Sequence, residues 1–322
     1  MADNGAMFVL SGATIDNQDG EVHVASDGLL DLTGSGTIEG GLLTSEQGAQ
    51  IGGGILRDVT MTGVLRQDLN RLTTLQGTIT NNGTFTFDND TSNSNGSIID
   101  TSLRVNENVV LNGTGEVVLT SGETGIEGDG LLTLADCTIR GSGRVNVSVT
   151  NAGTLFADSA SGDLDLEGSV ALTTNSVLAV NLDGSNFSQS GRLDFELPIS
   201  LNGELKIVVG DNFSAAMGAQ RQIIVAPEII STFAEIDQLM AQSLTNGFVF
   251  DVVYNPTDVS VVVTDIFLLA DINLDGQVNL LDVQPFVELI TSGQFQREGD
   301  LNGDGQVNLL DVAPFVNLLT GG

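Results

Sequence analysis

The chain is poor in the residues that most often carry catalysis or covalent cross-links. Trp is absent, and the 322 residues include one His, one Cys, one Tyr and five Pro. A single cysteine, Cys137, excludes any disulfide within the chain. A Ser-His-Asp triad or a zinc site would have to use His23, and nothing in the sequence pairs with it. We therefore expect His23 to be a satisfied strand residue and Cys137 to be a buried thiol.

Positive charge is also scarce. Ten basic residues face 42 acidic ones, which gives a net charge of −32, and Lys206 is the only lysine. Such a surface repels nucleic acid and anionic membranes, attracts divalent cations and keeps a rod-shaped secreted protein soluble. No stretch approaches the roughly 20 apolar residues of a membrane helix. We therefore expect neither a nucleic-acid partner nor membrane insertion.

Residues 1–190 are rich in glycine, threonine and asparagine and contain short apolar runs. In Gly83 to Phe87, Gly115 to Leu119 and Gly143 to Val147, apolar residues largely alternate with polar ones, as in strands with one buried face. Turn-like starts recur, as in Asn81-Asn82-Gly83 and Asn151-Ala152-Gly153, because Asn and Gly tolerate the backbone of a tight corner.

Strand-and-turn units of this kind, without helical periodicity, predict a mainly β fold. Over residues 1–190 we favour a parallel β-solenoid (β-helix), with coils of about 20 residues stacked at roughly 4.8 Å. A jelly-roll or two Ig-like sandwiches is the alternative.

Residues 191–265 are interpreted as a β-rich cap that covers the exposed end of the solenoid. Strands are expected at 201–209 and 221–226, a hairpin around Asn255 to Asp258, and a short helix or loop over Ile236 to Leu244. The segment with Tyr254-Asn255 and Val259, Val261 and Val263 resembles the C-terminal end of Gly-rich, autotransporter-like passenger repeats of secreted bacterial proteins. The resemblance implies a strand-rich unit that closes a β-helix.

Two near-identical twelve-residue loops begin at Asp271 and Asp300. Each places oxygen-bearing side chains at loop positions 1, 3, 5, 9 and 12, and a glycine at position 6, Gly276 or Gly305. Ca²⁺ takes six to eight oxygen ligands, and the glycine permits the sharp turn that lets alternate side chains converge. The sequence therefore predicts a small calcium module over residues 266–322.

An apolar stripe at helical spacing follows each loop. The stripes predict two helices that bury these faces against each other, and Pro285 and Pro314 lie early in the helices, where a missing N–H costs least. The stripe residues are Val283, Phe286, Val287 and Ile290 in the first copy and Val312, Phe315, Val316 and Leu319 in the second.

Residues 271–322 resemble the type I dockerin family, a tandem of EF-hand-like loop–helix repeats that anchors secreted bacterial proteins to a cohesin partner. The resemblance implies two bound Ca²⁺ ions, with the carbonyls of Gln277 and Gln306 adding to the side-chain ligands. The implied ligands are Asp271, Asn273, Asp275, Gln277, Asn279 and Asp282 in the first loop and Asp300, Asn302, Asp304, Gln306, Asn308 and Asp311 in the second.

The chain departs from dockerins at loop positions 10 and 11. Dockerins commonly carry Ser/Thr-type residues there, which help to select the cohesin. Here these positions hold Leu280-Leu281 and Leu309-Leu310. The apolar pairs either face a partner or pack within the module. The partner is accordingly a cohesin-like domain or another copy of the chain.

Acidic pairs offer the only hint of catalysis. Polysaccharide lyases and hydrolases on β-solenoids use clustered carboxylates. The pairs are Asp16 with Asp19, Asp88 with Asp90, and Asp163 with Asp165; all lie in turn-like polar stretches, where Asp is common. We therefore expect no catalytic residues, and a secreted polysaccharide-degrading enzyme that carries a dockerin is the alternative function.

The favoured function is a non-enzymatic, calcium-stabilised structural or adhesive protein, whose tail mediates assembly, including head to tail into a filament. Met1 to Asn4 shows no signal peptide. The chain is thus either the mature form of a secreted protein or a cytoplasmic protein. We favour an extracellular or cell-surface location, because cytosolic free Ca²⁺ is too low to fill most such loops.

Overall fold

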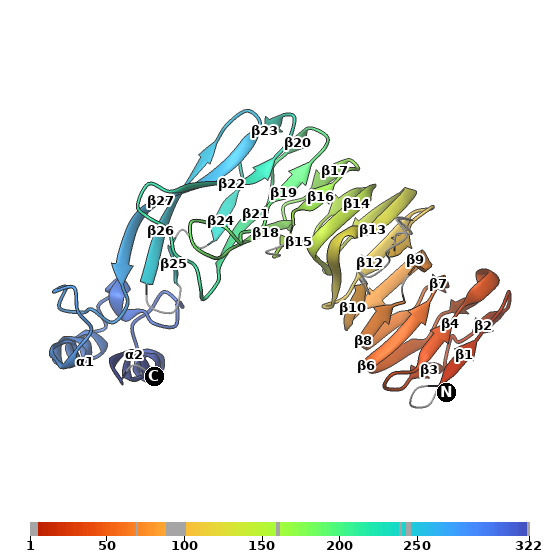
Figure 1. Cartoon of the computed structure of the whole chain (residues 1–322), viewed down its shortest axis with the longest axis horizontal. Helices are drawn as coiled ribbons and strands as arrows, with labels where there is room; N and C mark the ends of the chain where they lie inside the picture. Colours follow the sequence, from red (N-terminus) through yellow and green to blue (C-terminus); the bar gives the residue numbers. More distant parts are fainter. Residues whose placement is uncertain are drawn as a thin grey trace.

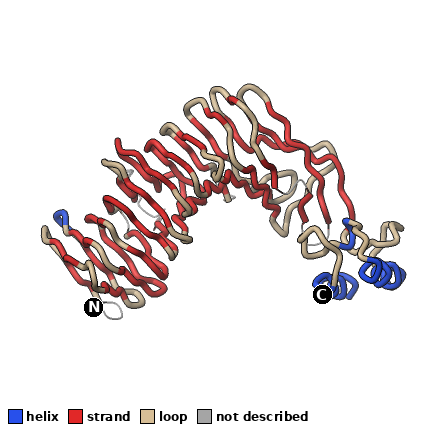
Figure 2. The backbone as a smooth tube through the Cα atoms, turned by 180° about the vertical axis from the view of Figure 1, so that it is seen from behind, coloured by secondary structure: helices blue, strands red, loops and turns tan. Residues whose placement is uncertain are grey.

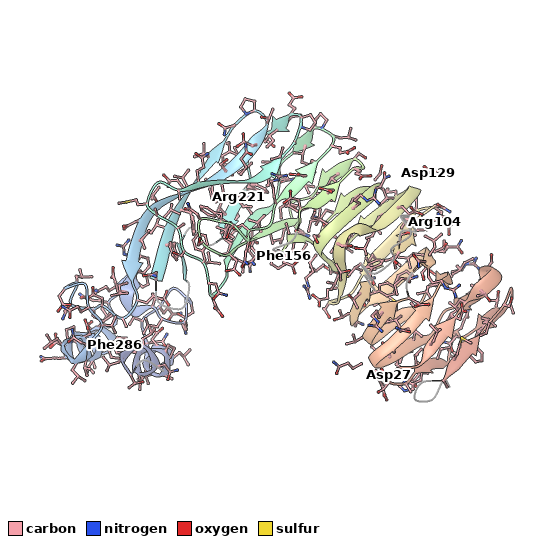
Figure 3. All side chains as sticks on the ribbon, viewed as in Figure 1. Asp27, Arg104, Asp129, Phe156, Arg221 and Phe286 are labelled. Atoms are coloured by element: carbon pink, nitrogen blue, oxygen red, sulfur yellow. The ribbon has the colours of Figure 1, made fainter. Side chains whose placement is uncertain are left out.

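The chain folds into an elongated, curved and mainly β body with two short α-helices at one end (Figures 1 and 2). The structure is a computed structural model and describes residues 6–68, 70–87, 101–158, 162–237, 240–242 and 246–320. Figure 3 places Asp27 near the N-terminal end of the body and Phe286 among the helices at the opposite end.

Most strands are short, and the two longest are β13 and β14. They are β1 (Met7–Val9), β2 (Thr14–Asp16), β3 (Glu21–Val24), β4 (Leu29–Asp31), β5 (Thr37–Glu39), β6 (Leu42–Gly52), β7 (Gly54–Arg57), β8 (Thr60–Gln67), β9 (Leu72–Asn81), β10 (Thr84–Phe87), β11 (Thr101–Arg104), β12 (Val109–Asn112), β13 (Glu116–Leu134), β14 (Thr138–Asn151), β15 (Thr154–Ala157), β16 (Leu164–Leu166), β17 (Val170–Leu172), β18 (Val177–Leu182), β19 (Leu193–Phe195), β20 (Ile199–Ser200), β21 (Glu204–Val209), β22 (Gln220–Val225), β23 (Ile229–Ile230), β24 (Glu235–Asp237), β25 (Met240–Gln242), β26 (Asn246–Tyr254) and β27 (Asp258–Leu268).

Helical segments are few and lie mostly at the C-terminal end. The α-helices are α1 (Val283–Ser292) and α2 (Val312–Thr320). Single 3₁₀ turns are η1 (Thr33–Ser35), η2 (Leu280–Asp282), η3 (Arg297–Gly299) and η4 (Leu309–Asp311). In the described residues, no helix is long and apolar enough to cross a membrane.

Strands that are distant in sequence pair in parallel, layer upon layer. Residue 7 is the register partner of residue 29, which is in turn the partner of residue 50. We call β1, β2 and β3 the first layer; they pair with β4, β5 and the start of β6. This parallel pairing, here called the stack, continues as far as β24, which pairs with β21. The predicted mainly β class is confirmed.

The core of the stack consists of apolar side chains that alternate along the strands. In β10 and β15 every second residue is buried, as the period-two pattern predicts. One apolar cluster extends from Val24 to Val263. Each layer therefore adds Leu, Ile, Val or Phe side chains to columns that are continuous with the layers on either side.

The predicted corners at Asn81-Asn82-Gly83 and Asn151-Ala152-Gly153 share one hydrogen-bonded geometry. The backbone N–H of Gly83 donates to Asn81 Oδ1 at 3.1 Å, and that of Gly153 donates to Asn151 Oδ1 at the same distance. A Cβ on Gly83 would lie 2.2 Å from the carbonyl oxygen of Gly63 in the adjacent layer. Glycine is thus required here because the backbones of two layers approach closely.

An antiparallel hairpin covers the C-terminal end of the stack. β27 pairs antiparallel with both β26 and β22, so the hairpin predicted around Asn255 to Asp258 is confirmed. The helix or loop predicted over Ile236 to Leu244 is wrong for its described part, because Ile236 lies in β24 and residues 240–242 form β25. Residues 238–239 and 243–244 lie outside the described residues. Pairing with β21 and β26 outweighs the weak local preference of this segment.

Candidate metal centre

The first loop begins just after β27, and its first carboxylate organises the turn. Asp271 Oδ1 accepts a hydrogen bond from the backbone N–H of Asp275 at 3.1 Å, and its Oδ2 accepts one from Gly276 at 2.8 Å. Gly276 has a φ of +84°, in the left-handed region. The predicted sharp turn at position 6 is therefore present, and Asp271 holds it closed.

The last residue of the loop ties its two ends together. Asp282 Oδ1 accepts from the N–H of Asn273 at 3.1 Å, and its Oδ2 accepts from the N–H of Asn279 at 2.9 Å. Asn279 in turn caps η2 by accepting from Leu281, which gives a capping box at the start of the helix. Asp282 is fully buried, so its carboxylate lies inside the loop.

The second loop repeats this arrangement closely. Asp300 accepts from the N–H groups of Asp304 and Gly305 at 3.1 and 2.9 Å. Asp311, also fully buried, accepts from Asn302 and Asn308 at 3.1 and 2.8 Å. Two segments with the same residue pattern thus form the same loop, so the geometry follows from the pattern rather than from the surroundings of either copy.

The side chains at loop positions 3 and 5 also accept hydrogen bonds from the backbone of their own loop. Asn273 Oδ1 accepts from the N–H of Asp275 at 2.9 Å, and Asp275 Oδ1 accepts from Gln277 at 3.0 Å. Asn302 and Asp304 make the corresponding bonds at 3.0 and 2.9 Å. The side chains at positions 1, 3, 5 and 12 thus accept hydrogen bonds from the backbone of their own loop, whereas Asn279 and Asn308 cap the turns that follow.

Both loops bury carboxylate side chains. Each loop holds three carboxylates, and those at positions 1 and 12 are buried: Asp271 and Asp282, Asp300 and Asp311. In the described part of the chain, no ion pair with Arg or Lys includes Asp282 or Asp311. Burial raises the pKa of Asp300, and the nearby charges of Asp311 and Asp304 raise it further.

The donor set fits Ca²⁺ better than a transition metal. In the described residues, no three His, Cys, Asp or Glu side chains gather closely enough to hold a metal ion. Each loop has three carboxylates, but they do not gather closely enough to hold a metal ion by themselves. A calcium loop of this type also uses Asn side chains and a backbone carbonyl as ligands. An all-oxygen set of carboxylates, amides and a carbonyl suits a hard cation of flexible coordination.

The two loop–helix units pack against each other through their helices. The rings of Phe286 and Phe315 stack with centroids 4.1 Å apart, which confirms the predicted packing of α1 on α2. Leu289 and Val307 are buried in the same cluster. Val287 and Val316 were predicted to belong to the buried stripe, but both are about half exposed. Position 8 of the loops, Val278 and Val307, supplies apolar contact to this cluster in place of the third stripe position.

The leucine pairs at positions 10 and 11 face solvent. Leu280 and Leu281 are 78% and 67% exposed, and Leu309 and Leu310 are 77% and 67% exposed. Packing within the module, one of the two alternatives from the sequence, is therefore wrong. The 3₁₀ turns η2 and η4 direct these side chains outward because the neighbouring Asp282 and Asp311 occupy the inner side.

Arg297 joins the module to the sheet, a role that the sequence analysis missed. Its guanidinium contacts Asp265 of β27 at 2.7 Å and Glu298 at 2.9 Å, and it lies over the ring of Phe267 at 4.4 Å. Glu298 is buried at this junction, whereas Arg297 and Asp265 are partly exposed. The signal was present in the sequence, since Arg297 is the only basic residue after Arg221.

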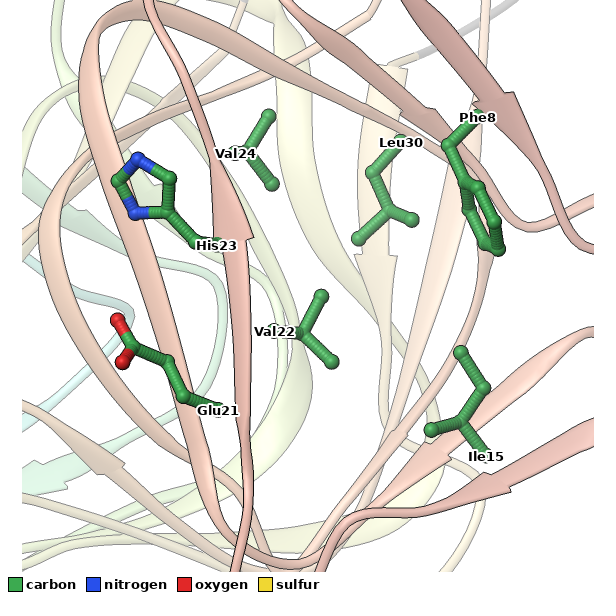
Figure 4. Close-up of a pocket in the computed structure, with 7 residues that line it drawn as sticks. All are labelled: Phe8, Ile15, Glu21, Val22, His23, Val24 and Leu30. Carbon is green, nitrogen blue, oxygen red and sulfur yellow. The ribbon is translucent and has the colours of Figure 1, made fainter. Parts of the chain in front are cut away.

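His23 and Cys137 lie in the structure as the sequence predicts, the first as a hydrogen-bonded strand residue and the second as a buried thiol. His23 lies in β3 (Figure 4), with Nδ1 2.8 Å from Thr44 Oγ1 and Nε2 3.5 Å from a Glu46 oxygen. Cys137 is fully buried, and desolvation raises the pKa of its thiol to about 11. A thiol that stays protonated at neutral pH is a poor nucleophile.

Of the two acidic pairs that the structure describes, only Asp163 and Asp165 join a larger cluster. Asp165 is the register partner of Asp194, and Arg192 contacts both Asp163 and Asp194 at 2.6 Å. Burial raises the pKa of Asp165 to about 6, helped by the charges of Asp194 and Asp163. Asp16 and Asp19 are exposed, and Asp88 and Asp90 lie outside the described residues.

No protein-family model matches the chain, and a search of curated proteins found no match.

Proposed function

We propose that the protein is a non-enzymatic, extracellular structural or adhesive protein that Ca²⁺ stabilises and that assembles through its C-terminal module. One observation carries the proposal: two equivalent loops with buried carboxylates stand at the end of an elongated body that is otherwise held by apolar columns. The first part suits a spacer or display surface, and the second suits a connector.

The proposed fold of the body is a parallel β-solenoid with a β-rich cap. The support is the regular register, in which each strand pairs in parallel with one from the previous pass of the chain and one from the next. Within the cap proposed over residues 191–265, the antiparallel β26–β27 hairpin covers the end, while β19, β21 and β24 still continue the parallel pairing. Such a body would hold the module at a fixed distance from whatever the other end contacts.

The proposed module is dockerin-like and binds two Ca²⁺ ions. The carboxylates of Asp271, Asp282, Asp300 and Asp311 would hold the ions together with the Asn, Asp and Gln residues of the two loops. Ca²⁺ would neutralise carboxylates that burial otherwise penalises. Extracellular calcium is high enough to fill such loops, which is why we propose a secreted location.

The proposed docking surface consists of the outward leucine pairs. Exposed apolar side chains at matching positions of both repeats would lose contact with water on docking, which favours association. The partner is proposed to be a cohesin-like domain or another copy of the chain, and the second case includes filament growth.

The test is particle shape and metal content. Isothermal titration of the metal-free chain with Ca²⁺ should report two sites, and electron microscopy should show rods whose association is lost in EGTA. Replacing Leu280 and Leu309 with Asp should abolish association and leave calcium binding intact. Polymers that persist unchanged in EGTA, with metal removal verified, would rule out calcium-dependent docking.

A secreted polysaccharide-degrading enzyme is the second candidate, favoured by one cluster only. Asp165, with its raised pKa, lies beside Asp163 and Asp194, an arrangement that resembles a general acid next to a carboxylate. Screening acidic and neutral polysaccharides for turnover distinguishes the enzymatic proposal from the structural one. Turnover that Asp165→Asn abolishes would replace the structural proposal with the enzymatic one.

A further inference from the structure

The two loops differ at the residue that follows the asparagine at position 3. In the second loop Asn302 is followed by Gly303, and in the first loop Asn273 is followed by Leu274. A backbone nitrogen can attack the carboxamide carbon of an asparagine that precedes it, and a Cβ on the attacking residue crowds that approach. Glycine has no Cβ, so only the second loop has an unhindered nitrogen at this position.

The side chain of Asn302 is folded back over the backbone that follows it. Its Oδ1 accepts a hydrogen bond from the N–H of Asp304 at 3.0 Å, and its Nδ2 donates to Asp304 Oδ2 at 2.9 Å. An asparagine bonded in this way to the amide two residues later lies beside the amide in between, which is that of Gly303. In the part of the chain that the structure describes, the N–H of Gly303 donates to no acceptor. The nitrogen is therefore not held away from the side chain.

The first loop provides the same geometry without the glycine. Asn273 Oδ1 accepts from the N–H of Asp275 at 2.9 Å, and Asn273 Nδ2 donates to Asp275 Oδ2 at 3.2 Å. Both asparagines are exposed, so water reaches each of them. The residue at position 4 is therefore the main difference between two otherwise matched sites.

The other Asn-Gly pairs are more constrained. In three of the five pairs that the structure describes, the asparagine is partly buried. In a fourth the asparagine is exposed, but the glycine N–H donates to Asn81 Oδ1 at 3.1 Å. Among the described pairs, the second loop alone combines an exposed asparagine with an unbonded glycine N–H. The three partly buried asparagines are in Asn112-Gly113, Asn202-Gly203 and Asn246-Gly247, the fourth pair is Asn82-Gly83, and Asn4-Gly5 and Asn95-Gly96 lie outside the described residues.

We propose that Asn302 is a site of spontaneous deamidation, and that the second loop undergoes this modification when it holds no cation. The nitrogen of Gly303 forms a bond to Cγ of Asn302, the Cγ–Nδ2 bond breaks, and ammonia leaves with the proton of the Gly303 N–H. The product is a cyclic succinimide. Water then opens the ring, at Cγ to give aspartate or at the backbone carbonyl carbon to give isoaspartate. Water is the only reactant besides the chain.

A bound cation opposes the reaction, and this part of the inference rests on the proposed calcium binding. Asn302 would hold Ca²⁺ through Oδ1, and Asp300 and Asp304 would hold the same ion on either side of it. Ring closure needs the carboxamide to turn and the backbone at 302–303 to move. In the empty loop only hydrogen bonds to Asp304 restrain the side chain, whereas a filled loop must first lose the free energy of metal binding.

The two products affect the second loop differently. Aspartate keeps an oxygen at position 3 and adds a fourth carboxylate to the loop, beside Asp300, Asp304 and Asp311. Isoaspartate carries the main chain through its side chain, which inserts a CH₂ group before Gly303 and displaces the turn that follows. A long period without calcium therefore alters the second loop permanently and leaves the first loop unchanged.

Reciprocal exchange of the residues at position 4 tests the proposal. Gly303→Leu should remove the reactive pair from the second loop, and Leu274→Gly should create one in the first; neither changes a side chain assigned to the cation. The full-length chain and both variants are kept at mildly alkaline pH, in EGTA or in excess Ca²⁺. Peptide mass spectrometry measures conversion separately at Asn273 and Asn302, and isothermal titration of fresh protein with Ca²⁺ is run in parallel.

In EGTA, Asn302 should convert at least tenfold faster than Asn273, and excess Ca²⁺ should slow its conversion at least tenfold. Gly303→Leu should lower the rate at Asn302 to that of Asn273, and Leu274→Gly should raise the rate at Asn273 towards that of Asn302. Equal rates at the two asparagines in EGTA would overturn the proposal. So would a rate at Asn302 that Ca²⁺ leaves unchanged although titration shows both loops filled.

The titration separates this inference from the proposed function. A chain that binds no Ca²⁺ contradicts the proposed function and, with it, protection by the cation. In such a chain, faster conversion of Asn302 than of Asn273 would still support the modification site, and equal rates would still overturn it.

Discussion

The stack and the C-terminal module bury opposite kinds of side chain. In the stack, columns such as Ile38 above Leu56 fill the interior, and layers add contacts without needing any ligand. In the module, the most deeply buried positions include the carboxylates of Asp282 and Asp311. A buried carboxylate costs free energy unless a cation or hydrogen bonds compensate it. The stack is thus held by apolar contacts, whereas the buried carboxylates of the module are held by backbone N–H groups and, as proposed above, by Ca²⁺.

Removal of calcium should separate the two regions most strongly. In EGTA, we expect amide hydrogen exchange over residues 271–282 and 300–311 to accelerate at least tenfold, while exchange over 29–57 stays unchanged. A ligand at 100 times its dissociation constant contributes about 2.7 kcal/mol of stability, and that contribution disappears with the metal. Exchange measured by mass spectrometry reports each segment separately.

A point variant sharpens the same test. Asp282→Ala should make exchange over 271–282 insensitive to Ca²⁺, and Leu280→Ala, two positions away on the exposed side, should keep the full calcium response. Equal protection of the loops with and without metal in the unmodified chain would contradict the dependence of the module on a cation.

The next largest expected effect is a loss of stability of the stack where the backbones of adjacent layers approach closely. Gly83→Ala should destabilise the stack by about 1–3 kcal/mol, because its Cβ would meet the Gly63 carbonyl at 2.2 Å. Gly122→Ala is the control, since no atom lies within 4 Å of the added Cβ. Urea unfolding followed by far-UV circular dichroism measures both. If the two variants lost the same stability, general strand propensity and not layer spacing would explain the glycines.

The parts that could be predicted from sequence are those encoded by short repeating patterns. Alternation in 83–87 predicted β10. The oxygen pattern from Asp271 predicted a tight loop, and in the structure Asp271 closes that loop by accepting two backbone hydrogen bonds. What failed depended on distant partners. Ile236 lies in a strand because β21 lies beside it, and Val287 faces solvent because Val307 of the other repeat fills the core. Neither fact is local to its segment.

An acidic cluster provides an exception within the stack, and its effect depends on pH. Burial and neighbouring carboxylates raise the pKa of Asp165 to about 6, above its value in the unfolded chain. Ionised Asp165 therefore opposes folding above pH 6, and this cost fades as pH falls toward 4. Asp165→Asn should stabilise the stack by about 1 kcal/mol at pH 7.5, allowing for solvent screening, and by nothing near pH 3.5.

Thermal unfolding at the two pH values measures the effect. Asp19→Asn, on an exposed turn, is the control and should change the melting temperature equally little at both. A gain for Asp165→Asn that is the same at pH 3.5 and pH 7.5 would mean that the benefit comes from packing and not from a removed charge.

The smallest expected effect is on the stability of the loops, at the one loop position where one copy has glycine and the other does not. Position 4 is Leu274 in the first loop and Gly303 in the second, and both adopt a left-handed φ, +59° and +72°. A residue with a Cβ pays about 1 kcal/mol for that conformation, and Leu274 is largely exposed, so it gains little packing in return. Leu274→Gly should therefore raise the stability of the calcium-loaded first loop by less than 1 kcal/mol, since glycine also loses more entropy on folding. Gly303→Leu is the reciprocal change and should lower the stability of the second loop by a similar amount. Hydrogen exchange at 271–282 and 300–311 resolves the two loops, and a loss of protection in Leu274→Gly would show that the leucine stabilises its loop by contacts rather than straining it.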